Sequence, residues 1–151
     1  MDNISLEILK ILQEKARIPN VEVSRQVGLA PSAVLERIRK LEKKGIIDGY
    51  EVRLNPDRFN CSPLAFLSVL PEPTATKEVG KRLSELIDIQ EVHFIASRDG
   101  YLLKARVANT DELARLLQEH IAPIPGIVST STETVLTTLK ETGRIPIPDT
   151  F

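Results

Sequence analysis

A turn and a basic helix are encoded by Gly28-Leu29-Ala30-Pro31-Ser32-Ala33-Val34-Leu35-Glu36-Arg37-Ile38-Arg39-Lys40-Leu41-Glu42-Lys43-Lys44-Gly45. Gly28 can adopt the positive φ that ends a preceding helix, and Pro31 suits a first helical turn, where its missing N–H is no loss. Val34, Ile38 and Leu41 then recur on one side of the helix and form an apolar stripe. The final glycine of the stretch ends the helix. This sequence therefore predicts a tight turn followed by a short amphipathic helix.

Positive charge is concentrated on that same helix. Between residues 31 and 44, five Lys and Arg stand against two Glu, a local balance of +3, whereas the whole chain carries −1. A basic helix that follows a tight turn fits the major groove of DNA, as the second helix of a helix-turn-helix does. The alternative is a solvated charged helix on an unrelated bundle. So modest a patch binds DNA weakly as a monomer, which favours a dimer or a larger assembly.

Candidate DNA contacts lie along the polar side of this helix. Arginine is the best bidentate partner for guanine, so we expect Arg37, with Ser32 and Ala33 near the helix start, to meet base edges. The other interpretation is that Arg37 pairs with Glu36 or contacts phosphate alone. The remaining cations are expected to contact phosphates and so fix the position of the helix on the DNA. They are Arg39, Lys40, Lys43 and Lys44.

The rest of the first third of the chain completes a small helical domain. Apolar spacing predicts a helix over 3–15 and a second helix over 21–27, with Asn20 as its N-cap. Residues 46–54 predict a short strand or wing that an Asp-Gly pair interrupts. The expected boundaries are residues 1–54 for a winged helix-turn-helix domain and 55–63 for a linker rich in turn-forming residues.

Beyond the linker, the pattern becomes that of an α+β domain over residues 64–151. The predicted strands and helices follow the order βαββαβ, which is the ferredoxin-like arrangement. They cover residues 64–70, 76–88, 91–96, 101–107, 110–121 and 127–139. Such an antiparallel sheet carries helices on one face only, so the other face is expected to meet solvent or a second copy.

Composition argues against several classes of protein. No apolar run reaches the roughly 18 residues that a membrane span needs, and we expect no signal peptide. The single cysteine, Cys61, cannot form an internal disulfide and fits a reducing cytoplasm. The two histidines, His93 and His120, lie in different segments without metal-ligand spacing. No nucleophile–base pair or phosphate loop occurs, so we expect no catalytic residue, no metal and no cofactor.

Several segments in a consistent order carry a family resemblance over nearly the whole chain. They are Ile8-Leu9-Lys10-Ile11-Leu12-Gln13, the run from Val27 to Ile47, Tyr101-Leu102-Leu103-Lys104, Ile124-Pro125-Gly126-Ile127 and Thr130-Ser131-Thr132. Together they resemble the Lrp/AsnC family of bacterial and archaeal transcription regulators. The resemblance implies a homodimer that assembles further, often into octamers. It also implies a C-terminal effector-binding and oligomerisation domain, the RAM domain, that takes an amino acid between dimers.

Two positions depart from the family pattern. Ala30 stands where the family has Ser or Thr as the N-cap of the recognition helix, a loss of about 1 kcal/mol. The family's effector loop runs Gly, two variable residues, Asp, Tyr. This chain has Ser97 and Gly100 at the Gly and Asp positions, and Asp99 is displaced by one place. The resemblance therefore does not fix the identity of the effector.

The candidate effector pocket combines that loop with the threonine-rich last strand. Loop N–H groups can hold a carboxylate, Asp99 can accept from an ammonium group, and threonine hydroxyls can bond to either. The alternative is a plain hairpin beside a strand whose threonines follow β-propensity. The candidate residues are Ser97, Arg98, Asp99, Gly100, Tyr101, Thr130, Thr132 and Thr134.

The leading hypothesis is a cytoplasmic regulator that is not an enzyme. We expect it to bind double-stranded DNA, a small amino acid and further copies of itself, and we expect no membrane contact. One alternative is a siroheme decarboxylase-like subunit, because those enzymes resemble the same two-domain architecture. They are rich in His and aromatic residues, however, and this chain has two His, two Tyr and no Trp. The other alternative is an effector-binding assembly protein whose helix-turn-helix is vestigial.

Overall fold

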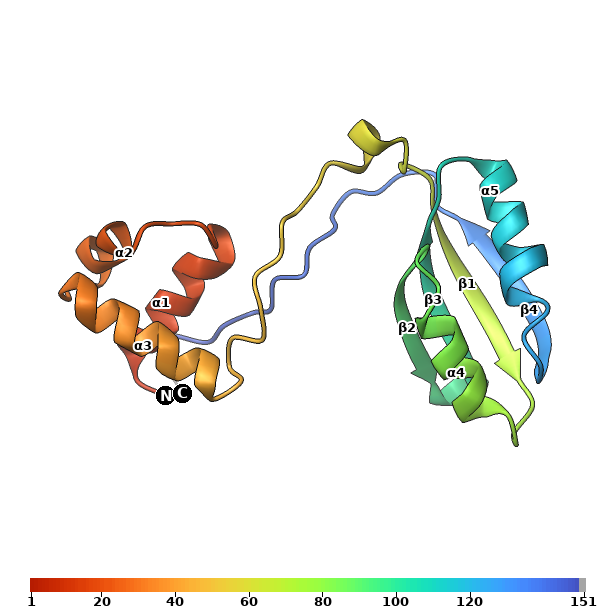
Figure 1. Ribbon diagram of the computed structural model, residues 1–151, viewed down its shortest axis with the longest axis horizontal. Coiled ribbons are helices and arrows are strands. Elements are labelled where there is room, and N and C mark those ends of the chain that lie inside the picture. The colour runs from red at the N-terminus through yellow and green to blue at the C-terminus, as the bar shows by residue number, and fades with distance from the viewer. Residues whose placement is uncertain (150–151) are drawn as a thin grey trace. The chain divides into compact units, whose positions relative to one another are not determined.

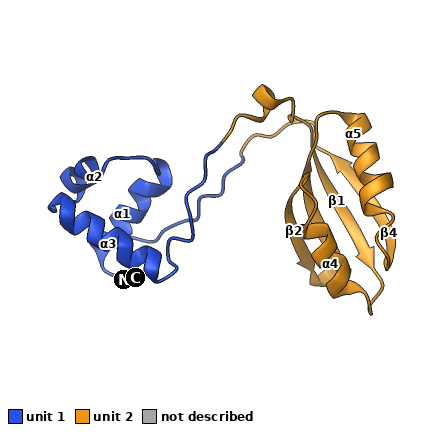
Figure 2. Cartoon of the chain, viewed as in Figure 1, with its two compact units in different colours: residues 1–53, 141–151 blue, residues 54–140 orange. Residues whose placement is uncertain are grey.

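The computed structural model describes residues 1–149 and divides into two compact units (Figures 1 and 2). The first unit comprises residues 1–53 with the C-terminal residues from 141, and the second comprises residues 54–140. Each unit has a hydrophobic core of its own. The C-terminal boundary differs from the expected 64–151, because residues 141–149 hydrogen-bond to the first helix of the first unit.

Three helices build the first unit, and they are α1 (Asn3–Glu14), α2 (Asn20–Val27) and α3 (Pro31–Lys43). One face of each helix supplies the core, where Ile8, Val23 and Val34 have no exposed surface. Burying each such side chain stabilises the fold by roughly 1.5–3 kcal/mol. The amphipathic spacing seen in the sequence therefore forms the expected helix-turn-helix.

The turn between α2 and α3 has the predicted backbone. Gly28 has a φ of 68°, and its N–H donates to the carbonyl of Ser24. Ala30 precedes Pro31 and makes no side-chain capping bond. The predicted N-cap of α2 is wrong: Asn20 is the first helical residue, and Pro19 occupies the cap with a φ of −62°. Proline sets that φ through its ring and has no N–H to leave unsatisfied.

The predicted strand or wing over 46–54 does not form. The chain there has no strand, and Val52 and Leu54 are 83% and 60% exposed. A strand needs a partner for its ladder of hydrogen bonds, and residues 1–53 contain no other strand. Tyr50 holds this stretch instead, because its hydroxyl donates to Glu42 Oε1 on α3 at 2.9 Å.

Four strands and two helices follow a short 3₁₀ turn in the predicted linker. They are β1 (Leu64–Pro71), α4 (Thr76–Ser84), β2 (Ile89–Ile95), β3 (Gly100–Arg106), α5 (Thr110–Arg115) and β4 (Ile127–Thr134). A π-helical segment, Leu116–Ile121, continues α5. The sheet is antiparallel with the order β2-β3-β1-β4, which confirms the ferredoxin-like α+β class.

Strand alternation separates the two faces of this sheet. Leu67 and Leu103 face the helices and have no exposed surface, and Val79 of α4 packs in the same core. Both helices cover that one face (Figure 1). Phe66 and Leu102 point to the opposite, helix-free face and are half-buried. No helix within residues 1–149 is long and apolar enough to cross a membrane.

Candidate DNA-binding helix and effector pocket

The polar side of α3 lies opposite its buried apolar stripe. Helical spacing places one outward row there, and its members, all exposed, are Ser32, Glu36, Arg39 and Lys43. Ala33 is half-buried on the flank of this row. Within residues 1–149, the side chains of Arg39, Lys43 and Lys44 make no ion pair. These three cations are therefore available to an external anion.

Lys40 differs from its neighbours in having an internal partner. Its Nζ lies 3.2 Å from Glu36 Oε1, and the two side chains are 67% and 70% exposed. An exposed pair at this helical spacing contributes only about 0.3–0.5 kcal/mol. A phosphate can therefore compete for Lys40 at little cost.

Arg37 is engaged inside the unit rather than in the outward row. Its Nη1 donates to Asp2 Oδ2 at 2.5 Å and to Ser5 Oγ at 3.3 Å, and the side chain is 31% exposed. Asp2 also caps α1, because its Oδ1 accepts from the N–H of Ser5 at 2.9 Å. Hydrogen bonds from Ser5 and Arg37 hold the pKa of Asp2 well below its ordinary value. Arg37 thus ties α3 to the N-terminus of α1.

The structure gives Arg37 an internal partner that the sequence does not indicate. The sequence had offered Glu36 or DNA as partners of Arg37, whereas the partner is Asp2, 35 residues away. Arg37 lies one turn before the buried Leu41, so helical spacing alone already puts it at the edge of the apolar stripe. The arginine of the outward row is Arg39.

A contact after α3 orders the chain that leaves this helix. Burial, together with the hydrogen bond to the Glu42 carboxylate, raises the pKa of Tyr50 to about 12. The phenol therefore stays protonated near neutral pH and keeps donating to Glu42. This bond also occupies one of the two acidic side chains of α3.

A small hollow of about 120 Å³ opens in the second unit, where β1, β3 and β4 lie side by side. Its lining residues are Ser68, Val69, Leu70, Arg98, Gly100, Tyr101, Ser129, Thr130 and Ser131. Nη1 of Arg98 donates to Ser68 Oγ at 3.1 Å. One guanidinium and several hydroxyl groups thus surround the hollow, and no carboxylate lines it. Such a lining suits the carboxylate of a small molecule.

Part of the predicted effector set reaches this hollow. Arg98, Gly100, Tyr101 and Thr130 line it, whereas Ser97, Asp99, Thr132 and Thr134 do not. Asp99 closes the hairpin instead, with a φ of 47° in the left-handed region.

Strand register explains the two threonines that do not line the hollow. Thr132 lies opposite Leu67 and Thr134 opposite Ala65, further along β4 than the hollow, which Ser129, Thr130 and Ser131 line. Thr130, Thr132 and Thr134 share the helix-covered face. Ser129 and Ser131 lie on the other face, beside Ser68. The effector residues predicted from the sequence do not include these three serines. A polar Ser68 inside an otherwise apolar strand was the signal that could have indicated them.

Two of the lining residues are fixed by close packing. A Cβ on Gly100 would lie 2.7 Å from the backbone oxygen of Val69, so the glycine allows β3 to approach β1. The hydroxyl of Tyr101 donates to the carbonyl of Thr76 at 2.9 Å and ties the strand to the start of α4. The ring of Tyr101 also meets Phe94 edge-to-face, with centroids 5.3 Å apart. The floor of the hollow is therefore rigid.

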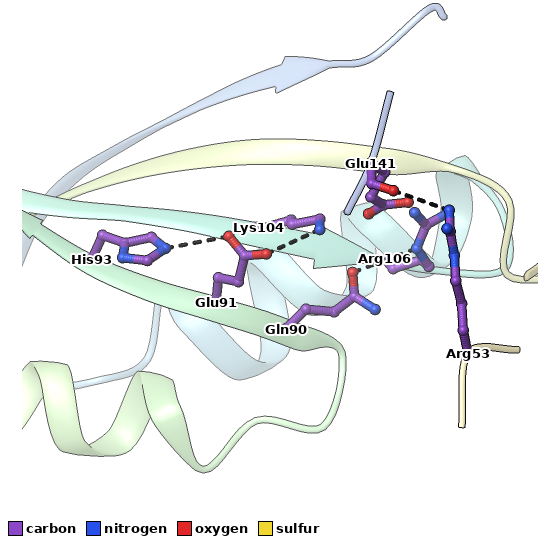
Figure 3. A network of polar contacts seen from close by, with 7 residues as sticks. All are labelled: Arg53, Gln90, Glu91, His93, Lys104, Arg106 and Glu141. Atoms are coloured by element: carbon purple, nitrogen blue, oxygen red, sulfur yellow. Dashed lines mark hydrogen bonds and ion pairs between the residues drawn. The ribbon is translucent and has the colours of Figure 1, made fainter. Parts of the chain in front are cut away.

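A charged network that includes Glu91 and His93 of β2 occupies the helix-free face of the sheet (Figure 3). The Glu91 carboxylate lies between Lys104 and His93. Its Oε1 is 3.0 Å from Lys104 Nζ, and its Oε2 is 3.2 Å from His93 Nε2. The hydrogen bond from Lys104 holds the pKa of Glu91 below its ordinary value. Beside them, Nε of Arg106 donates to Gln90 Oε1 at 3.5 Å. This network gives the face a polar margin around Phe66 and Leu102.

A larger hollow, of about 410 Å³, lies between α1 and α2 of the first unit. It is lined by Ile11, Glu14, Lys15, Ile18, Glu22 and Gln26. Its charges have both signs and do not converge, so we assign no ligand to it. Among residues 1–149, no group of three or more His, Cys, Asp or Glu side chains is arranged to hold a metal ion.

Both units match described protein families. Residues 1–48 match the winged helix-turn-helix DNA-binding family, and residues 64–145 match the Lrp/AsnC ligand binding domain. The chain belongs to the Lrp/AsnC family. As a member of that family, it is a DNA-binding transcriptional regulator with a C-terminal ligand-binding domain.

Relatives in the Lrp/AsnC family support this assignment over nearly the whole chain. The chain is 37% identical to the leucine-responsive regulatory proteins of Klebsiella pneumoniae and Escherichia coli K12, over 97% of this chain and 92% of each relative. A Neisseria meningitidis transcriptional regulator, solved in complex with L-Met, has a TM-score of 0.92 at 26% identity, covering 97% and 96% of the two chains. An AsnC family regulator from Agrobacterium tumefaciens has a TM-score of 0.90 at 26% identity, covering 97% of each chain.

Proposed function

We propose that assemblies of this chain bind double-stranded DNA through α3, and that an amino acid bound in the RAM domain changes this binding. One observation carries the DNA half of the proposal. The apolar stripe of α3 is buried in its own unit, while Arg39, Lys43 and Lys44 extend from the exposed side without an ion-pair partner among residues 1–149.

The side chains of α3 divide into two roles. Arg39 shares the outward row with Ser32, so we assign base-edge contact to Arg39, with Ser32 and Ala33 close to the same groove floor. Lys40, Lys43 and Lys44 neutralise phosphates, which fixes position without reading sequence. Arg37 holds the helix in place through Asp2.

A homodimer brings two α3 helices to the DNA, so it binds more tightly than one chain with a single weak contact. The helix-free face of the sheet carries half-buried Phe66 and Leu102 inside a polar margin, which suits burial against a second copy. A homodimer places two recognition helices in successive major grooves, about 34 Å apart. Further association of dimers, up to an octamer, would bend or wrap the DNA and favour flexible flanking sequence.

The hollow beside Arg98 is the proposed effector site. Arg98 and the hydroxyls of Ser129 and Ser131 provide donors for the α-carboxylate of a free amino acid, and backbone carbonyls accept from its ammonium group. L-Met bound to the Neisseria relative supports an amino acid as the ligand class. The family match supports a regulator of transcription, acting in the cytoplasm, rather than a siroheme decarboxylase-like enzyme.

Selection of genomic DNA fragments by the purified protein, with and without a panel of free amino acids, tests the proposal. We expect enrichment of a small set of fragments sharing a roughly palindromic site, and a changed yield with at least one amino acid. A protein that enriches no fragment over random DNA contradicts the DNA half. An enrichment that no amino acid alters contradicts the effector half.

A further inference from the structure

The C-terminal residues 141–149 form a segment, here called the strap, that contacts the first unit. Figure 2 shows this part of the chain in the colour of the helix-turn-helix. The strap has no helix or strand of its own. Its order within the unit therefore comes from the contacts that it makes with other segments.

The main contact is a two-point hydrogen bond from one side chain of α1. Gln13 Nε2 donates to the carbonyl of Ile145 at 3.1 Å, and Gln13 Oε1 accepts from the N–H of Ile145 at 2.9 Å. The amide thus pairs with both backbone groups of a single residue, as a neighbouring strand would. This mode recognises an extended backbone and does not depend on the side chain of Ile145, which is 69% exposed.

Further anchors lie on either side of that bond. Arg144 Nη2 donates to the carbonyl of Glu14 at 3.3 Å, one of the carbonyls that the end of α1 leaves without a helical partner. Asp149 accepts from Lys10 Nζ, one turn before Gln13 on α1. At the start of the strap, the carbonyl of Glu141 accepts from Arg53 Nη2 at 3.0 Å. Contacts are thus distributed along the whole strap.

The sequence of the strap favours this extended form. Pro146 and Pro148 fix φ near the extended range and hold Ile145 and Ile147 out of the helical region. Less conformational entropy is then lost when the strap docks. Leu6 shares a face of α1 with Lys10 and Gln13 and is 1% exposed, although it is not part of the three-helix core cluster. This face of α1 is therefore covered.

We propose that the Lys10–Gln13–Glu14 surface of α1 is a docking site for the strap, and that this docking transmits the state of the effector pocket to the helix-turn-helix. The transmission rests on the proposed function above. Ser129, Thr130 and Ser131 line the hollow on β4, and only residues 135–140 separate the end of β4 from the strap. Six residues reach about 20 Å at most, so a short stretch of chain joins the strap to the lining of the hollow.

The test uses the full chain and its Gln13→Ala variant, with Gln26→Ala as the matched control. Gln26 is an exposed glutamine on α2 that contributes no hydrogen bond to the strap. Exchange of the Ile145 amide reports docking directly. We expect Gln13→Ala to speed that exchange about tenfold, and Gln26→Ala to leave it unchanged.

The same proteins then report the coupling. Affinity for a fragment selected by the parent is measured alone and with L-methionine, L-leucine or L-glutamate. We expect one of these to change the parent's affinity by about fivefold or more, and Gln13→Ala to reduce that change to less than about twofold. Gln13→Ala should bind DNA like the parent when no amino acid is added, because α3 is untouched.

Each contrary result has its own meaning. Equal Ile145 exchange in the parent and in Gln13→Ala overturns docking. A response to amino acid that Gln13→Ala retains in full, or a parent that responds to none of the three, overturns the coupling. A parent that binds no DNA contradicts the proposed function instead, and Ile145 exchange still decides docking.

Discussion

The proposed recognition helix, α3, and the proposed effector hollow present their polar groups in different ways. On α3, one regular helix aims Arg39 and Lys43 outward, and neither has an ion-pair partner within residues 1–149. In the hollow, three strands and a hairpin contribute, and the only cation, Arg98, is already hydrogen-bonded to Ser68. The cations of the proposed DNA surface are thus available to an external anion, whereas the proposed effector site would have to exchange an internal bond for a ligand.

The largest expected effect concerns Arg39. We expect Arg39→Ala to lower affinity for the selected fragment by about 10- to 100-fold, because a bidentate base contact contributes roughly 1–3 kcal/mol of discrimination. Binding to a scrambled fragment should fall much less. The measurement is a titration of both fragments, with Arg25→Ala on α2 as control. An equal loss on both fragments would show that Arg39 contacts phosphate only.

A second change examines the rigidity of the hollow. Gly100→Ala places a Cβ 2.7 Å from the backbone oxygen of Val69, so β1 and β3 must separate. We expect a loss of about 1–3 kcal/mol in the free energy of unfolding, together with a weaker amino-acid response. Gly49→Ala is the control, because its added Cβ meets no atom within 4 Å. Thermal unfolding that ranks the two variants equally would contradict the close approach.

A third prediction concerns the ion pair between Arg37 and Asp2, a contact that Arg39 lacks. Folding lowers the pKa of Asp2, so the stability contributed by its carboxylate is present above the ordinary value of 3.8 and is lost as the pH falls below it. Asp2→Asn should therefore be less stable than the parent at neutral pH, and the difference should shrink in acid. Unfolding curves across this pH range give the comparison. A difference that stays constant with pH would place the effect elsewhere.

The smallest effect belongs to the phosphate contacts. Lys43→Ala should reduce the slope of log affinity against log salt by about 0.9, the change expected for one released counterion. The preference for the selected fragment over scrambled DNA should remain. Titrations at several salt concentrations measure both quantities. A lost preference with an unchanged slope would reverse the roles of Lys43 and Arg39.

Features that depend on local sequence could be predicted, whereas features that depend on distant segments could not. The α3 helix and its buried stripe follow from local periodicity, and so do the βαββαβ order and the turn at Gly28. Arg37 and the strap depend on partners far along the chain, Asp2 and Gln13, which no local pattern indicates. In the hollow, the sequence identified β4 and Thr130 but not the serines beside it, because a shift of one residue in register exchanges Ser131 for Thr132.

Lysine acetylation in the presence and absence of the selected fragment, measured by mass spectrometry, tests the central claim most directly. If α3 lies in the DNA groove, Lys43 and Lys44 become protected when the fragment binds, while Lys81 on α4 reacts at its former rate. If Lys43 and Lys44 stay fully reactive on bound protein, α3 does not contact the DNA and the account of this regulator is wrong.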